Sequence, residues 1–214
     1  MIVPRIVRRV VPPLGDWPDH IPPVLRRIYA ARGAGSFAET QRRLADLLPP
    51  DALGGIDAAS TLLVDAIRND RRIVIVGDFD CDGATGTAVG VRGLRMLGAR
   101  NVTYQVPHRV LHGYGLTPAL VEVMRPLQPD LIVTVDNGIA SHAGVAAAKA
   151  LGWDVLITDH HLPGATLPLA DAIVNPNLLG DDFPSKALAG VGVLFYLLLA
   201  TRRRLGANPP ADLA

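Results

Sequence analysis

The sequence predicts an α/β fold in which a mostly parallel β-sheet is flanked by helices, in Rossmann-like layers. Short, wholly apolar runs such as residues 73–76 indicate strands that are buried on both faces of a sheet. These runs alternate with segments of helical pattern, and that alternation is typical of a parallel sheet with covering helices.

The part that precedes the first apolar run has a different character. Residues 1–35 are rich in proline and arginine, and we expect them to wrap around the surface of a larger folded body. Residues 36–39 have the form of a capping box and predict a helix through about Leu48, where two prolines stop it. A second helical pattern covers residues 57–68.

From residue 72 onward the elements follow one another closely, and a helix rich in apolar residues ends the series. We therefore expect residues 1–70 to form a leader with helices that pack on a core, and residues 71–214 to form the core domain. The strands are predicted at 73–76, 102–106, 131–135, 154–158 and 172–174, and the helices at 84–97, 118–124, 141–151 and 187–200.

Composition limits the class of protein. An apolar fraction of 49% and a charged fraction of 19% are typical of a folded globular chain, and a net charge of +1 argues neither for nor against nucleic acid. The single cysteine, Cys81, excludes an internal disulfide framework and fits a reducing cytoplasm. The apolar run 187–200 is shorter than the roughly 20 residues that a membrane span needs. These features predict a soluble, cytoplasmic protein.

Acidic residues and histidines follow three of the predicted strands directly. Because functional groups gather at the carboxyl ends of parallel strands, we expect all three sets at one edge of the sheet. The sets are Asp78, Asp80 and Asp82; Asp136, Asn137 and Gly138; and Asp159, His160 and His161.

Such crowding has a chemical meaning. Several carboxylates brought together repel one another unless cations neutralise them. Carboxylates mixed with imidazole suit Mn²⁺, and Mg²⁺ prefers the oxygens. Two such ions about 3.5–4 Å apart stabilise both the attacking and the leaving oxygen in phosphoryl transfer. The sequence holds no Ser-His-Asp set or Walker loop, and no GxGxxG follows the first strand, so dinucleotide binding is disfavoured.

Each set also has a simpler interpretation. Alternating aspartates after a strand serve as turn and capping residues, and Asp136-Asn137-Gly138 has the composition of a turn. Adjacent histidines after an apolar strand have no packing purpose, however. The coincidence of three sets at successive strand ends favours the metal site.

Six motifs in order resemble those of the DHH phosphoesterase superfamily, most closely its RecJ-type single-strand-specific exonucleases. The resemblance covers about residues 71–199. The motifs are VGDFDCDGATGTA, PHRVLHGYGL, TVDNGIASHAGV, LITDHHLPG, AIVNPN and ALAGVGVLFYLLL.

The resemblance implies a DHH-like fold and a metal-dependent enzyme that hydrolyses phosphodiester bonds of single-stranded DNA from the 5′ end, in DNA repair and recombination. Two Mn²⁺ or Mg²⁺ ions are implied in the complete enzyme. A single-strand-binding protein and a helicase are implied as partners. Alternatives are a DHH phosphoesterase for short oligonucleotides, cyclic dinucleotides or pyrophosphate, and a non-catalytic nucleic-acid-binding fragment.

The same resemblance assigns roles to matching positions. Asp136 would bridge the two ions, His161 would act at the scissile phosphate, and Asp78 would lie beside or just behind the metal ligands. On physical grounds Asp159 is a candidate acceptor for a ligand imidazole, the alternative being that its side chain points into the sheet. The implied metal ligands are Asp80, Asp82, Asp136 and His160.

A second group of residues is assigned to the substrate: His108, Arg109, Tyr114 and Gly138. The planar guanidinium of Arg109 suits phosphate oxygens, and Tyr114 either stacks on a base or packs between its glycines. Gly138 is expected to allow close approach of the backbone to metal or phosphate. The glycines Gly190 and Gly192 are expected to serve close helix packing.

The sequence departs from the family pattern in two places. Cys81 occupies the middle of the acidic segment, and we expect it to be a buried, inert thiol. A further metal-binding aspartate, expected after the 187–200 helix, has no match. We therefore expect an N-terminal piece of a longer protein, which folds and binds Mn²⁺ weakly but cleaves DNA poorly.

Overall fold

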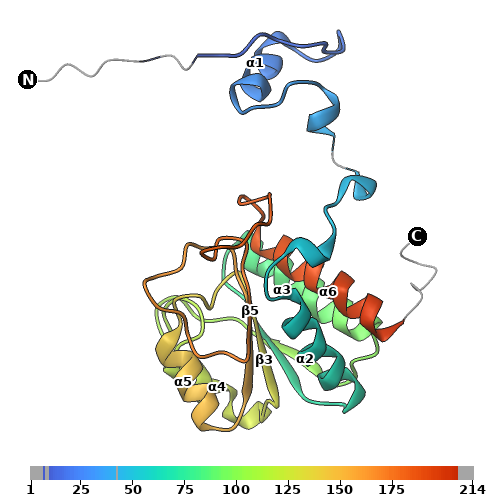
Figure 1. Ribbon diagram of the computed structural model, residues 1–214. Coiled ribbons are helices and arrows are strands. Elements are labelled where there is room, and N and C mark those ends of the chain that lie inside the picture. Colours follow the sequence, from blue (N-terminus) through green and yellow to red (C-terminus); the bar gives the residue numbers. More distant parts are fainter. Residues whose placement is uncertain (1–6, 8–9, 42, 207–214) are drawn as a thin grey trace, which may run out of the picture. The chain divides into compact units, whose positions relative to one another are not determined.

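The computed structural model describes residues 7, 10–41 and 43–206 (Figure 1). The chain divides after Leu48 into two compact units.

The first unit holds one α-helix, α1 (Pro23–Ala31), which begins at a proline, a residue that suits the first helical position. A small aromatic cluster lies beside it. Trp17 is buried, stacks on Tyr29 with ring centroids 5.8 Å apart, and meets Phe37 edge-on at 6.2 Å.

The helix predicted for residues 36–48 is wrong. Its place is taken by two 3₁₀ turns, η1 (Ala38–Thr40) and η2 (Leu44–Asp46), with extended backbone at Gln41. The carboxylate of Glu39 accepts the N–H of Gly35 at 3.0 Å, and the capping box at residues 36–39 is not followed by an α-helix. A helix this short needs tertiary packing of an apolar face, and Leu44 is 78% exposed.

The second unit is built on a five-stranded sheet in which all neighbouring strands are parallel. The chain runs from β1 outward to β2 and then returns past β1 to β3. Strand order therefore reverses between β1 and β3, and open α/β sheets bind ligands outside the carboxyl ends of strands at such a switch point. The strands are β1 (Ile73–Val76), β2 (Val102–Gln105), β3 (Leu131–Val135), β4 (Asp154–Thr158) and β5 (Ala172–Val174), in the order β2-β1-β3-β4-β5.

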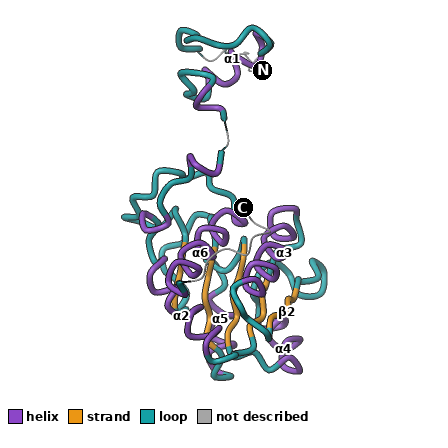
Figure 2. Tube along the Cα trace, turned by 90° about the vertical axis from the view of Figure 1, so that its right-hand side faces the viewer, coloured by secondary structure: helices purple, strands orange, loops and turns teal. Residues whose placement is uncertain are grey.

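Helices cover both faces of this sheet, so the predicted α/β fold is confirmed (Figures 1 and 2). The inner strands β1 and β3 are wholly buried, as their apolar sequences require. One face carries α2 (Ile56–Arg68), α3 (Cys81–Met96) and α6 (Gly190–Leu205), and the other carries α4 (Pro118–Met124) and α5 (His142–Ala150); two 3₁₀ turns, η3 (Pro50–Ala52) and η4 (Arg125–Leu127), complete the unit.

Helix α3 begins three residues before the predicted start at residue 84. The cause is Asp80, whose Oδ1 accepts the N–H of Gly83 at 2.9 Å and thereby caps the helix. Asp82 therefore lies on the first helical turn, while Asp78 and Asp80 precede the helix. Cys81 is exposed, so the expectation of a buried thiol is wrong.

Helix α6 begins three residues after the predicted start at 187 and continues through the arginine cluster. Contacts with α2 support this extension: Arg204 donates to Ser60 Oγ at 2.7 Å and to Asp57 Oδ1 at 2.6 Å. Among the described residues, no helix is long and apolar enough to cross a membrane.

Helix α2 packs against α6 and β5, so its buried face belongs to the core of the second unit. Leu63 is fully buried, whereas its neighbour Leu62 is only partly buried. We predict that Leu63→Ala lowers the free energy of unfolding by about 2–5 kcal/mol, the usual cost of a leucine-sized cavity. Urea denaturation followed by circular dichroism measures this. The matched change Leu62→Ala should cost clearly less, and equal losses would contradict the assignment of α2 to the core.

Candidate metal centre

The carboxyl ends of β1, β3 and β4 bring together the acids and histidines that the sequence analysis singled out. Two overlapping groups have side-chain ligand atoms within 4.8 Å of one another, and Asp136 belongs to both. The groups are Asp78, Asp80 and Asp136, and Asp136, His160 and His161.

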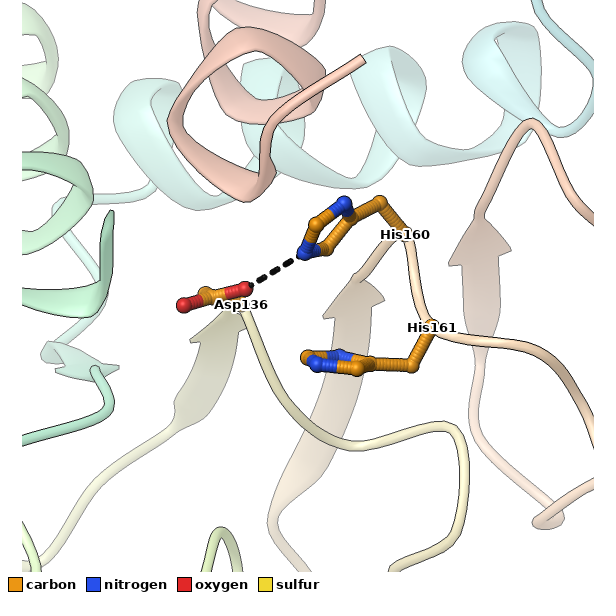
Figure 3. A group of neighbouring side chains, drawn as sticks. All are labelled: Asp136, His160 and His161. Atoms are coloured by element: carbon orange, nitrogen blue, oxygen red, sulfur yellow. Dashed lines mark ion pairs between the residues drawn. The ribbon is translucent and has the colours of Figure 1, made fainter. Parts of the chain in front are cut away.

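Asp136 lies at the centre of this arrangement, directly after β3 (Figure 3). Its backbone has φ +63°, a left-handed conformation that aspartate tolerates better than most residues. Its side chain is 3% exposed, and Nε2 of His160 lies 3.0 Å from Oδ1. That contact lacks hydrogen-bond geometry, so among the described residues Oδ1 is a buried oxygen without a hydrogen-bond partner.

The electrostatics of the cluster oppose ionisation. Burial, together with the charges of Asp82 and Asp80, raises the pKa of Asp136 to about 7. Burial also raises the pKa of Asp78, with a smaller contribution from Asp80. A bound cation removes this penalty because it neutralises the carboxylates. The orphaned oxygen, the crowded acids and a neighbouring imidazole nitrogen fit a divalent metal of the Mn²⁺ type.

Asp82 faces the same site from α3, but its oxygens have protein partners. Oδ2 accepts the N–H of Gly190 at 2.7 Å and Oδ1 accepts the N–H of Val191 at 2.8 Å, so this carboxylate caps α6. Oδ2 also lies 3.7 Å from Nε2 of His160. Each oxygen keeps a second lone pair, and the role of Asp82 as a metal ligand stays a prediction.

The start of α6 packs directly on the central carboxylate. A Cβ added at Gly190 would lie 2.6 Å from Cβ of Asp136, closer than real side chains approach. At Gly192 the added Cβ would lie 2.6 Å from the end of the Leu188 side chain. The contact at Gly190 fits the expected close packing of this helix, whereas at Gly192 the neighbour is the flexible end of a side chain and the expectation stays a prediction.

Asp159 holds the two histidines in place through hydrogen bonds. Its buried Oδ1 accepts the N–H of His160 at 2.7 Å and the N–H of His161 at 3.1 Å, while Oδ2 accepts the N–H of Ile139 at 2.9 Å. The same Oδ1 lies 2.7 Å from Nδ1 of His161. Asp159 is thus the acceptor for the ring of His161, which leaves Nε2 of His161 free for another partner.

The two imidazole rings both turn toward Asp136 (Figure 3). Burial lowers the pKa of His161, but the hydrogen bond and charge of Asp159 outweigh burial, so this pKa lies above its ordinary value. His161 is therefore suited to carry a proton beside the acidic cluster.

Two of the proposed substrate residues lie on one side of the cluster. The guanidinium of Arg109 lies 4.2 Å from the centre of the Phe79 ring, a cation–π contact, and its charge lowers the pKa of Asp78, against the larger effect of burial. The hydroxyl of Tyr114 donates to the carbonyl of Asp136 at 2.9 Å, so Tyr114 supports the left-handed turn. Its ring is 46% exposed, and base stacking stays a prediction.

His108 and Gly138 have local structural explanations. Nδ1 of His108 accepts the N–H groups of Val110 at 3.3 Å and Leu111 at 3.4 Å and so shapes its own loop. A Cβ at Gly138 would lie 2.5 Å from Oγ1 of Thr134, so packing against the sheet already requires glycine there. Contact of either residue with substrate stays a prediction.

Sequence reasoning missed three asparagines that hold the site. The buried side chain of Asn137 donates to the carbonyls of Val76 and Val135, each at 2.9 Å, and so ties the ends of β1 and β3 together. Asn175 and Asn177 bind the carbonyls of the two histidines. The only available signal was their place in the DNG and AIVNPN motifs directly after strands.

The raised pKa of Asp136 makes a prediction about stability. The folded protein holds this proton up to about pH 7, whereas an unfolded chain releases it near pH 4, so ionisation destabilises the fold as pH rises between these values. In the presence of a chelator, Asp136→Asn should exceed the parent protein in stability at pH 8 by on the order of 2–4 kcal/mol. The margin should fall to about 1 kcal/mol or less by pH 4.5. Urea denaturation at both pH values measures it, and a margin independent of pH would contradict the prediction.

Comparison with known proteins gives a consistent result. The DHH family, N-terminal domain, matches residues 72–214. The single-stranded-DNA-specific exonuclease RecJ of Salmonella typhimurium is 55% identical over 198 residues, which cover 92% of this chain and 34% of that protein. RecJ of Thermus thermophilus is 41% identical over 214 residues, which cover 95% of this chain and 30% of that protein. The chain thus spans about a third of the length of these relatives.

Solved structures agree. A crystal structure of exonuclease RecJ bound to manganese superposes with a TM-score of 0.66 at 42% identity and covers 77% of this chain and 41% of that one. The Thermus thermophilus RecJ complex with Mn²⁺ gives a TM-score of 0.62 at 42% identity and covers 77% of this chain and 22% of that one. From the motifs, the fold and these matches, the chain belongs to the DHH family.

Proposed function

We propose that this chain is the metal-binding part of a nuclease that hydrolyses phosphodiester bonds in single-stranded DNA. The observation that carries the proposal is the buried Oδ1 of Asp136, which lacks a hydrogen-bond partner among the described residues and belongs to a residue shared by both ligand groups. A residue in that position would help to hold metal ions on both sides of the cluster. The relatives named as single-stranded-DNA-specific exonucleases supply the substrate class.

The metals in this proposal are two Mn²⁺ or Mg²⁺ ions, in line with the RecJ structures solved with each metal. When bound, the ions would neutralise the carboxylates and stabilise negative charge on the transferring phosphoryl group. The residues that would hold them are Asp80, Asp82, Asp136 and His160, with Asp78 beside them.

The protein's own side chains would position the phosphate. Arg109, already held over Phe79, presents a planar fork of N–H donors that matches two phosphate oxygens. His161 has its Nδ1 fixed by Asp159, so a protonated ring directs its Nε2–H toward the cluster and donates to a phosphoryl oxygen. Orientation of this kind supplies much of the rate in phosphoryl transfer.

The finer parts of the proposal rest on family resemblance alone. They are degradation from the 5′ end, a place in DNA repair and recombination, and a single-strand-binding protein and a helicase as partners. The proposed cytoplasmic location rests instead on the single cysteine.

The function is tested with single-stranded DNA labelled at either end, incubated with the protein and Mn²⁺. This chain alone, which spans about a third of the length of its relatives, should cleave poorly. A form of the protein extended past residue 214 should release the 5′ label before the 3′ label, digest little duplex and cleave nothing without metal, and the variants below are made in that longer form. Asp136→Ala should abolish cleavage because the shared ligand is lost. Asp65→Ala, which removes an exposed carboxylate on α2, is the matched control and should cleave as the parent does.

Nuclease activity that survives in the Asp136→Ala protein would overturn the proposal. A substrate series of increasing length separates the alternative function: activity confined to the shortest oligonucleotides or to cyclic dinucleotides would favour a small-substrate phosphoesterase.

The neighbouring histidines should differ in their effects. His160→Ala removes an imidazole whose Nε2 lies 3.0 Å from Asp136, so it should weaken Mn²⁺ binding by at least about 100-fold, beyond the cost of losing an outer partner. His161→Ala should lower the cleavage rate by about 10²–10⁴-fold while Mn²⁺ affinity changes much less. Calorimetric Mn²⁺ titration and single-turnover cleavage measure the two effects. Equal loss of metal from both proteins would mean that His161 is also a ligand.

A further inference from the structure

The turn Asn175-Pro176-Asn177 lies immediately beside the two histidines, although the proposed chemistry does not use it. It follows β5, and the histidines follow β4. These strands are parallel neighbours with Thr158 opposite Val174, and the N–H of Asp159 donates to the carbonyl of Val174 at 3.1 Å. The two segments therefore leave the sheet at the same level.

Each asparagine binds the backbone of one histidine. Nδ2 of Asn175 donates to the carbonyl of His161 at 2.9 Å, and Nδ2 of Asn177 donates to the carbonyl of His160 at 2.5 Å. Asp159 holds the backbone N–H groups of the same two histidines. The backbone that carries both imidazoles is thus fixed through its donors from one side and through its acceptors from the other.

The turn itself is held in place by further hydrogen bonds. Oδ1 of Asn175, whose side chain is fully buried, accepts the N–H of Asn177 at 2.8 Å. The ammonium group of Lys186 donates to the carbonyl of Pro176 at 2.6 Å, and Nδ2 of Asn177 reaches the carbonyl of Lys186 at 3.2 Å. Lys186 lies shortly before α6, whose first residues bind Asp82.

We propose that Asn175 and Asn177 are positioning residues that set the direction of the His161 and His160 imidazoles, one asparagine for each histidine. The proposal deepens the proposed function and rests on it, since the site being positioned is the metal site. If the asparagines only stabilised the fold, there would be no need for each side-chain amide to bind the carbonyl of a different histidine. Outer residues that orient a metal-binding imidazole typically change metal affinity 10- to 100-fold when removed.

The test compares Asn177→Ala and Asn175→Ala with a matched control, Asn101→Ala. Asn101 also donates its Nδ2 to a backbone carbonyl, that of Asp70 at 3.1 Å, but it precedes β2 at the opposite edge of the sheet. The first readout is metal-free: the ¹³C carbonyl and imidazole resonances of His160 and His161, assigned by NMR. The second is the Mn²⁺ dissociation constant from calorimetry, with thermal unfolding followed in parallel.

Asn177→Ala should shift the resonances of His160, Asn175→Ala those of His161, and Asn101→Ala neither. Mn²⁺ affinity should fall about tenfold in Asn177→Ala and stay unchanged in Asn101→Ala. Asn177 is partly exposed, so its variant decides the matter if the buried Asn175→Ala protein does not fold.

Unchanged His160 resonances in Asn177→Ala, or equal shifts of both histidines in either variant, would overturn the proposal. So would an unchanged Mn²⁺ affinity in Asn177→Ala when the parent binds Mn²⁺. A parent protein that binds no Mn²⁺ would instead refute the proposed function, and the metal-free spectra would still decide whether the asparagines position the histidines.

Discussion

The repulsion among buried carboxylates around Asp136 is the constraint on which the rest of the site depends. The strand order reverses between β1 and β3, so the ends of these strands bring Asp78, Asp80 and Asp136 within reach of one another. In water such acids would separate, but the sheet holds them together, and the pKa of Asp136 rises to about 7 as a result. The sheet thus stores an unfavourable arrangement that a divalent cation relieves, which is the physical basis for reading it as a metal centre.

The carboxylates must be held in place by partners that do not neutralise their negative charge. Asp82 is fixed by two N–H groups of α6 rather than by a cationic side chain, and Asp159 is fixed by three backbone N–H groups. The backbone at Asp136 is held through the Tyr114 hydroxyl. Lys149 pairs with Asp154 and Asp171, Lys186 pairs with Asp181, and Arg109 faces the Phe79 ring. Dipoles therefore orient the acids while the charge remains available to metal and phosphate.

The local sequence pattern was enough to predict the strands that are buried in the sheet. The strands at 73–76, 131–135, 154–158 and 172–174 have the predicted bounds because continuous apolar runs exclude an exposed alternative. The predicted 36–48 helix failed because capping residues start a helix but do not sustain it without an apolar face to bury. The early start of α3 is the reverse case. Asp80 is an expected metal ligand, and the hydrogen bond that it accepts from Gly83 also sets where the helix begins.

The sequence by itself determined the α/β fold, the family and the set of acids and histidines at the strand ends, because these follow from residue type and short-range order. Only the tertiary structure decided which partner each side chain takes. Asp82 binds the N–H of Gly190, 108 residues away, and Asn137 binds the carbonyl of Val76, 61 residues away. Asn177 meets His160 because β4 and β5 are paired in register. Hydrogen bonds depend on direction and distance in space, and residues far apart in sequence acquire these only when the sheet and helices have packed.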